Sequence, residues 1–199
     1  MNPKWSPKVL GFVCWLSLCG GCAALQPASS RDVVVLDSVV LSGSDGGSHR
    51  LSTFVEKSKL TVFVFYSEHC PTMRAHESRL ISWAHDYRDQ QVQFVLVNSE
   101  LGGSVRRDAE VIRERAYPFL ILHDSSAYLA KTWGVEFATH TIIIDRQGTV
   151  QYSGGLDSDA SRLREDAQLY LPAALDELLA HGPVQTRPGD PLGCVLRLH

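Results

Sequence analysis

The stretch VFVFYSEHCPTMRAH, residues 62–76, decides the fold of this chain. It continues a nearly unbroken apolar run from Leu60 to Tyr66, which is typical of a β-strand covered on both faces. From Pro71 to about residue 89 the apolar residues recur at helical spacing. Proline suits the first helical position because its missing N–H would have no partner there. The stretch therefore predicts a buried strand, a short turn and a long helix.

Cys70 lies directly before the proline that opens this helix. Unpaired backbone N–H groups and the positive end of the helix dipole favour an anion at that position. A thiolate is such an anion, so the sequence predicts a reactive cysteine with a lowered pKa. The alternative interpretation is a buried cysteine that serves as a small apolar side chain.

Further elements follow on both sides of this stretch. Apolar and β-branched runs predict strands over residues 33–41, 92–97, 141–144 and 149–153, and Pro118 opens a short apolar run over residues 119–122. Helical periodicity predicts helices over residues 105–116, 126–133 and 169–180. Asp145 to Gly148 has the composition of a hairpin turn, and a turn cluster covers residues 43–47. Alternating strands and helices that end in a hairpin and a helix predict an α/β fold with a central mixed sheet flanked by helices.

The N-terminal residues 1–21 have the pattern of a secretory signal peptide. Lys4 and Lys8 precede an apolar run, and Gly20 and Gly21 follow it. The run is shorter than the roughly 20 residues that a transmembrane helix needs. The pattern resembles a bacterial lipoprotein signal, which implies cleavage before Cys22 and lipidation of that cysteine. A plain signal peptide that is cleaved a few residues later is the other interpretation.

After the signal peptide, the sequence predicts a tether over residues 22–31, one folded domain over residues 32–182 and an extended tail over residues 183–199. The expected location is outside the cytoplasm, on a membrane and facing the periplasm or the cell surface. Ala23 after the lipidated cysteine indicates the outer membrane, by analogy with bacterial sorting.

Charge and composition limit the function classes. The 199 residues contain 19 Lys and Arg against 22 Asp and Glu, for a formal net charge of −3. Such a balance gives no basic surface for phosphates, so we expect no nucleic-acid partner. The apolar fraction of 44% and charged fraction of 21% are typical of a globular protein.

Export gives the five cysteines different expected fates. Cys14 and Cys19 would leave with the signal peptide, and Cys22 would carry the lipid. Cys70 and Cys194 would remain, in a compartment where disulfides persist. They could form a redox pair, or Cys194 could be an unpaired thiol in the tail, because sequence separation says little about the distance between two thiols.

The chain resembles the thioredoxin-like superfamily, and within it the redoxin branch of alkyl hydroperoxide reductase/thiol-specific antioxidant-like domain lipoproteins. The segments that carry the resemblance are VFVFYSEHCP, FVLVNSE, AYPFLILHDSS, ATHTIIIDRQGTVQYSGGLD and the final PLGCVLRLH. The resemblance implies a thioredoxin-like fold and thiol-dependent redox activity.

Three positions depart from the motifs of this superfamily. Met73 stands where thioredoxins have the second cysteine of Cys-x-x-Cys. Ser67 fits the hydroxyl position of the peroxiredoxin motif, but Phe63 replaces its proline. Thr139 stands where a cis-proline usually faces the cysteine, and a cis bond before threonine would cost about 3 kcal/mol, so we expect a trans peptide.

The first functional hypothesis is a thiol oxidoreductase, without a cofactor, that acts on a disulfide or a peroxide. Its partners would be a thiol reductant or a protein disulfide substrate. The expected catalytic residues are Cys70 and Cys194. The expected substrate-contacting residues are Ser67, His69, Pro71, Thr139 and His140.

The second hypothesis is a non-catalytic carrier of copper or of a protein partner at the same site. Thiolate, thioether and imidazole groups suit Cu(I). The candidate metal ligands are His69, Cys70, Met73 and His140, with His76 nearby in the sequence.

Overall fold

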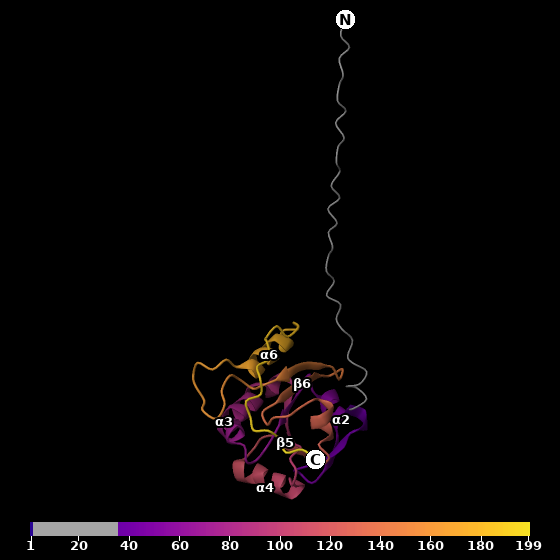
Figure 1. The fold of residues 1–199 in the computed structure, drawn as a ribbon. Coiled ribbons are helices and arrows are strands. Elements are labelled where there is room, and N and C mark those ends of the chain that lie inside the picture. Colours follow the sequence, from indigo (N-terminus) through magenta and orange to yellow (C-terminus); the bar gives the residue numbers. More distant parts are fainter. Residues whose placement is uncertain (2–35) are drawn as a thin grey trace.

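A mixed β-sheet forms the centre of the computed structural model, which describes Met1 and residues 36–199 (Figure 1). Within these residues the sheet has seven strands in the order β2-β1-β5-β4-β3-β6-β7. The strands are β1 Val40–Gly43, β2 Ser48–Arg50, β3 Leu60–Phe65, β4 Val92–Asn98, β5 Leu120–His123, β6 Thr141–Asp145 and β7 Val150–Gly154.

Three parallel strands, β5, β4 and β3, occupy the middle of the sheet. In the β3–β4 register Val62 pairs with Phe94 and Val64 with Leu96, and all six residues of β3 are buried. This explains the continuous apolar run in the sequence, because a central parallel strand is covered on both faces. The outer strands β6 and β7 on one side, and β1 and β2 on the other, pair antiparallel.

Helices cover both faces of the sheet. They are α2 Leu51–Lys57, α3 Pro71–Asp86, α4 Val105–Arg115, α5 Tyr128–Thr132 and α6 Tyr170–Leu179, with a short 3-10 helix at Arg88–Gln90. Figure 1 shows α3 and α2 on opposite sides of the sheet. Arg115 of α4 forms an ion pair with Glu77 of α3. Tyr87 donates a hydrogen bond to Asp176 of α6 at 2.7 Å, so α3, α4 and α6 share one face.

The expected elements are confirmed from residue 60 onward, with bounds that shift by a few residues. One expectation near the start of the described chain is wrong, and one helix there was not predicted. Residues 36–38 are helical, whereas a strand was expected over residues 33–41, and β1 begins only at Val40. Residues 51–57 form α2, for which the short apolar segment gave no clear period. Residues 2–35 lie outside the described residues, and with them the predicted signal peptide, Cys22 and the tether.

The C-terminal tail is extended, as expected from its prolines and glycines. It crosses the molecule from α6 to the C-terminus and appears in yellow in Figure 1. Within it, Val195 forms an isolated antiparallel bridge with Phe137, in the segment that precedes β6. We call residues 189–198 the strap. No helix among the described residues is long and apolar enough to cross a membrane.

Candidate redox site

Cys70 occupies the N-cap of α3, as the sequence predicts. Its backbone is extended, with φ −77° and ψ 115°, and Pro71 takes the first helical turn. The Cys70 N–H donates to the carbonyl oxygen of Ser67 at 3.2 Å, and the Cys70 carbonyl accepts from the N–H of Arg74 at 3.0 Å. These two bonds close the turn between β3 and α3 and fix the sulfur at the end of the central strand.

The strap covers this sulfur. Cys70 is only 1% exposed, so the burial expected in the alternative interpretation occurs together with the helix N-cap position expected of a reactive cysteine. The backbone N–H of Cys194 lies 3.2 Å from the Cys70 Sγ. Both cysteines are free thiols in this structure. The burial comes from a segment more than a hundred positions away in the chain, which no local pattern around residue 70 could indicate.

Backbone hydrogen bonds hold the strap in place. The N–H of Ala138 donates to the Cys194 carbonyl at 2.8 Å, and the N–H of Leu196 donates to the Glu136 carbonyl at 2.8 Å. Thr72 adds a side-chain bond from α3, with its Oγ1 donating to the Leu192 carbonyl at 3.3 Å. The strap therefore bridges the two segments on either side of Cys70.

Gly193 allows this close approach. A Cβ at this position would lie 1.8 Å from the carbonyl oxygen of Ala138, a distance that no real Cβ contact shows. The structure shows that only a residue without a side chain lets the strap lie against the segment before β6.

Electrostatics separate the two thiols. Burial acts to raise the pKa of Cys70, but hydrogen bonding from the Cys194 thiol and the amides of Met73, Cys194 and Thr72 lowers it below its ordinary value. The amides of Met73 and Thr72 belong to the first turn of α3, where N–H groups have no partner within the helix. The bond to Cys70, together with burial, raises the pKa of Cys194 to about 11. Of the two thiols, Cys70 therefore loses its proton at the lower pH, and Cys194 keeps its proton to higher pH.

Thr139 lies in the segment that contacts the strap. It is buried, and its N–H donates to the Phe65 carbonyl at 2.8 Å. None of the described peptide bonds is cis, so the expected trans peptide is confirmed. Its φ of 72° is in the left-handed region, which is strained for a β-branched residue. Thr139 therefore shapes the site through the conformation of its backbone.

The other expected contact residues are less central. Ser67 is buried and joins the site through its carbonyl oxygen, whereas Pro71 and His69 are exposed. His140 is partly buried, which lowers its pKa, and its Nε2 lies 2.9 Å from Ser153 Oγ. None of these four side chains has a hydrogen bond to Cys70 in the described part of the chain.

The copper alternative meets two geometric difficulties. Met73 is 1% exposed and packs in the core, and both ring nitrogens of His76 are already bonded to protein oxygens. Among the described residues, no group of three or more His, Cys, Asp or Glu side chains is arranged to hold a metal ion. His69, Cys70 and His140 therefore do not converge on one point.

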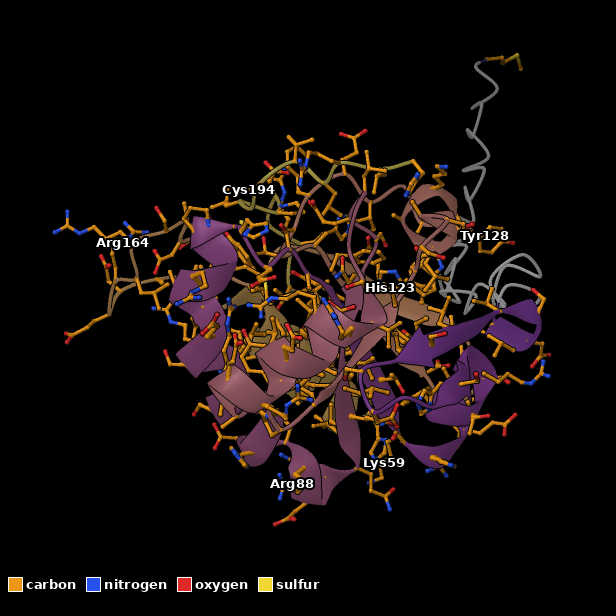
Figure 2. The ribbon with its side chains drawn as sticks, turned by 90° about the horizontal axis from the view of Figure 1, so that it is seen from below. Lys59, Arg88, His123, Tyr128, Arg164 and Cys194 are labelled. Carbon is orange, nitrogen blue, oxygen red and sulfur yellow. The ribbon has the colours of Figure 1, made fainter. Side chains whose placement is uncertain are left out.

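One cavity lies at the same end of the sheet as Cys70, and a second lies at the opposite end. A cavity of about 110 Å³ lies beside the turn that precedes Cys70. Its lining includes Ser67, His69, Asn98, Gly102 and Arg197. A larger one, of about 520 Å³, is lined by Lys59 and Arg146 and belongs to the opposite end of the sheet. Figure 2 shows Cys194 and Lys59 at opposite ends of the molecule, so we assign the redox chemistry to the smaller cavity's end.

Sequence reasoning missed Thr72 and Asp157 as site residues, and it considered His76 only as a possible metal ligand. Thr72 and His76 are four positions apart on α3, a spacing that could have suggested contact. Asp157 comes from the loop after β7, and nothing in the sequence indicates its contact with His76.

Comparison with known proteins agrees with the geometry. Residues 35–153 match the AhpC/TSA family. The chain belongs to this family. Membership supports thiol-dependent, peroxiredoxin-like redox function at the level of the family. A search of curated proteins finds no match to this AhpC/TSA chain.

Solved structures similar to this AhpC/TSA protein confirm its thioredoxin-like fold. An uncharacterized conserved protein from Geobacillus kaustophilus is 28% identical with a TM-score of 0.73, over 80% of this chain and 88% of that one. A hypothetical protein from Sinorhizobium meliloti 1021 is 25% identical with a TM-score of 0.72, over 81% and 91%. Peroxidoxin BcpB from Mycobacterium tuberculosis, 20% identical with a TM-score of 0.53 over 71% and 89%, shares the fold.

Proposed function

We propose that this protein is a two-cysteine thiol peroxidase, in which Cys70 attacks a peroxide and Cys194 resolves the product. The observation that carries the proposal is the contact of 3.2 Å between the Cys194 N–H and the Cys70 Sγ. The opposite pKa shifts of the two thiols support the assignment of roles. Membership of the AhpC/TSA family supports the reaction class.

The proposed cycle has three balanced steps. The Cys70 thiolate attacks one peroxide oxygen, the O–O bond breaks, and Cys70 becomes a sulfenic acid, while the leaving alkoxide or hydroxide takes a proton from solvent and departs as an alcohol or water. Cys194 then attacks that sulfur as a thiolate, having lost its proton to the departing hydroxyl, so that water leaves and a Cys70–Cys194 disulfide forms. An external dithiol supplies two electrons and two protons that restore both thiols.

Access requires that the strap opens. Cys70 is 1% exposed under an extended segment near the chain terminus, which is held by a small number of hydrogen bonds. Such segments belong to the least stable parts of a fold and open locally at a low free-energy cost. We therefore infer that opening of the strap precedes the attack on a peroxide.

Peroxide consumption with dithiothreitol as reductant tests the proposal. The wild-type protein is expected to turn over, Cys70→Ser to be inactive, and Cys194→Ser to stop at a sulfenic acid that dimedone labels. Peptide mapping of the oxidised wild type is expected to show a Cys70–Cys194 bridge. Wild-type activity in Cys70→Ser, or an oxidised protein with no such bridge, would overturn the proposal.

A second candidate function is dithiol–disulfide exchange with a protein substrate. The observation that favours it is the strap itself, an extended peptide that pairs with residues 136–138 and brings its cysteine to Cys70. A protein disulfide in an extended segment would offer the same groups. In Cys194→Ser such a substrate would remain attached to Cys70 as a mixed disulfide, detectable on non-reducing gels, whereas a peroxide would leave only a sulfenic acid.

Copper transport through His69, Cys70, Met73 and His140 remains the non-catalytic proposal. Titration of the reduced protein with Cu(I), with Met73→Ala as the comparison, tests it. Binding at one equivalent that weakens in the variant would support a carrier, and equal affinity in both proteins would contradict this ligand set.

We also propose that the protein is exported and anchored by a lipid on Cys22, with the folded domain facing the periplasm or the cell surface. The support is the order of Lys4, Lys8, the apolar run and the two glycines before Cys22.

A further inference from the structure

His76 is a buried residue of α3 whose two ring nitrogens both face acceptors. Its Nδ1 lies 2.8 Å from the Thr72 carbonyl oxygen, and its Nε2 lies 3.0 Å from Asp157 Oδ1. Carbonyl and carboxylate oxygens accept hydrogen bonds and cannot donate them. A neutral imidazole has only one N–H, so this geometry is satisfied in full by the doubly protonated ring.

The surroundings of His76 suit a positive charge. Asp157 has a fully buried carboxylate, which also accepts a hydrogen bond from Arg79 Nη1 at 2.6 Å. Burial acts to raise the pKa of Asp157, but the bonds from His76, Asp159 and Arg79 lower it. Arg79 contacts Asp159 as well, and Arg164 contacts Asp159 from the solvent side. Asp157 is thus the one charged group in direct contact with His76 in the described part of the chain, and Arg79 lies behind it.

The carbonyl that His76 contacts belongs to the peptide group next to the active sulfur. The C=O of Thr72 and the N–H of Met73 are the two ends of one peptide unit. In a helix the N–H points toward the N-terminus, so the Met73 N–H points toward Cys70, and it acts on that thiol. A hydrogen bond at the carbonyl polarises the peptide unit and makes its N–H a stronger donor.

We propose that His76 is a positioning residue for Cys70. The imidazolium of His76, which Asp157 holds in place, polarises the Thr72–Met73 peptide group and so favours the thiolate form of Cys70. The inference rests on the proposed function only in taking Cys70 as the reacting group. No covalent bond changes and no electron is transferred. The same contact also orients Thr72, whose hydroxyl holds the strap at Leu192.

The test measures the ionisation of Cys70 instead of turnover. The reduced protein and its His76→Gln variant are titrated by thiolate absorbance at 240 nm. The spectrum of each protein with Cys70→Ser added is subtracted, so that only the Cys70 contribution remains. We expect the thiolate fraction at neutral pH to fall about three- to tenfold in His76→Gln, because glutamine carries no charge and cannot donate to both acceptors.

Tyr87→Phe is the matched control. It removes a buried hydrogen bond between the other end of α3 and Asp176, so it perturbs the same helix without touching its first turn. We expect it to lower the thermal midpoint of unfolding while the Cys70 titration stays unchanged. If His76 had a purely structural role, His76→Gln and Tyr87→Phe would both lower the thermal midpoint of unfolding. Neither variant would then shift the titration of Cys70.

Nitrogen-15 NMR keeps the inference testable if His76→Gln fails to fold. In the wild-type protein at neutral pH, the His76 ring is expected to show two protonated nitrogens. A neutral ring would overturn the inference, as would an unchanged Cys70 titration in a folded His76→Gln. Failure of the proposed peroxidase activity would leave both readouts intact, so the two failures are distinguishable.

Discussion

Cys70 is subject to two opposing effects. Burial at 1% exposure disfavours a charged sulfur, while hydrogen bonds from the strap and the field of the first turn of α3 favour it. The second effect prevails in this structure, and the thiol of Cys194 is its largest component. The ionisation of the active residue therefore depends on a side chain from the end of the protein.

Cys194→Ala is expected to shift the titration of Cys70 to higher pH. The variant loses the thiol donor but keeps the backbone N–H, so the pKa of Cys70 moves back toward its ordinary value. The thiolate fraction, and with it the rate of the first oxidation, should then fall at neutral pH and recover as the pH rises. Thiolate absorbance at 240 nm against pH measures the shift. An unchanged midpoint would show that the Cys194 thiol has no influence on Cys70.

At the scale of an element, the strap determines whether Cys70 can be reached. It is neither a helix nor a strand of the sheet, and it is held by backbone bonds to residues 136–138 and by Thr72. At Gly193 the strap lies so close to the segment before β6 that an added Cβ would overlap the Ala138 carbonyl oxygen. A change there should therefore act on access to the site more than on the sheet.

Gly193→Ala is expected to displace the strap, because the new Cβ would meet the Ala138 carbonyl oxygen. Alkylation of Cys70 by iodoacetamide should become at least several-fold faster, as measured by mass spectrometry of tryptic peptides. Gly182→Ala is the control, since the nearest atom to its added Cβ, the Glu177 carbonyl oxygen, lies at an ordinary distance of 3.5 Å. Equal alkylation rates in Gly193→Ala and the wild type would show that the strap does not limit access.

Ser104 is the N-cap of α4, and its side chain accepts a hydrogen bond from the Arg107 N–H at 3.2 Å. Ser104→Ala should lower the free energy of unfolding by about 1 kcal/mol, which is the usual loss for an N-cap. Urea denaturation measures the change. Ser78→Ala, at an exposed position within α3, is the control and should not destabilise the protein. A loss of equal size in both variants would argue against a capping role.

At the scale of the whole molecule, one end of the sheet holds the candidate redox site. Cys70, Cys194 and the strap lie at the carboxyl ends of the parallel strands, where ligand sites of open α/β sheets occur. Lys59 and the larger cavity lie at the other end (Figure 2). The candidate redox site and the larger cavity are therefore separated by the length of the sheet.

Cys22→Ser is expected to release the protein from the membrane. When the full chain is expressed in a bacterium with a lipoprotein-processing pathway and labelled with radioactive palmitate, the wild type should carry the label and sediment with membranes. The variant should lose both properties while its signal is still recognised. Label and membrane association that persist in Cys22→Ser would contradict a lipid on this residue.

Local patterns determined the strands, the helices and the place of Cys70, because the burial of a strand or a helix face leaves its period in the sequence. The run from Leu60 to Tyr66 and Pro71 after Cys70 were sufficient for the strand, the helix and the N-cap. The apolar run over residues 33–41 predicted a strand where residues 36–38 are helical, and the segment of α2 was too short to show a period.

Only the tertiary structure decided what surrounds Cys70. Cys194 is 124 positions from it, and Asp157 is 81 positions from His76. Contacts over such separations depend on how the whole chain packs, and they leave no periodic signal near either residue. The sequence by itself therefore determined the fold class and the candidate nucleophile, whereas packing of the strap decided the burial of Cys70, its neighbouring thiol and the direction of its pKa shift.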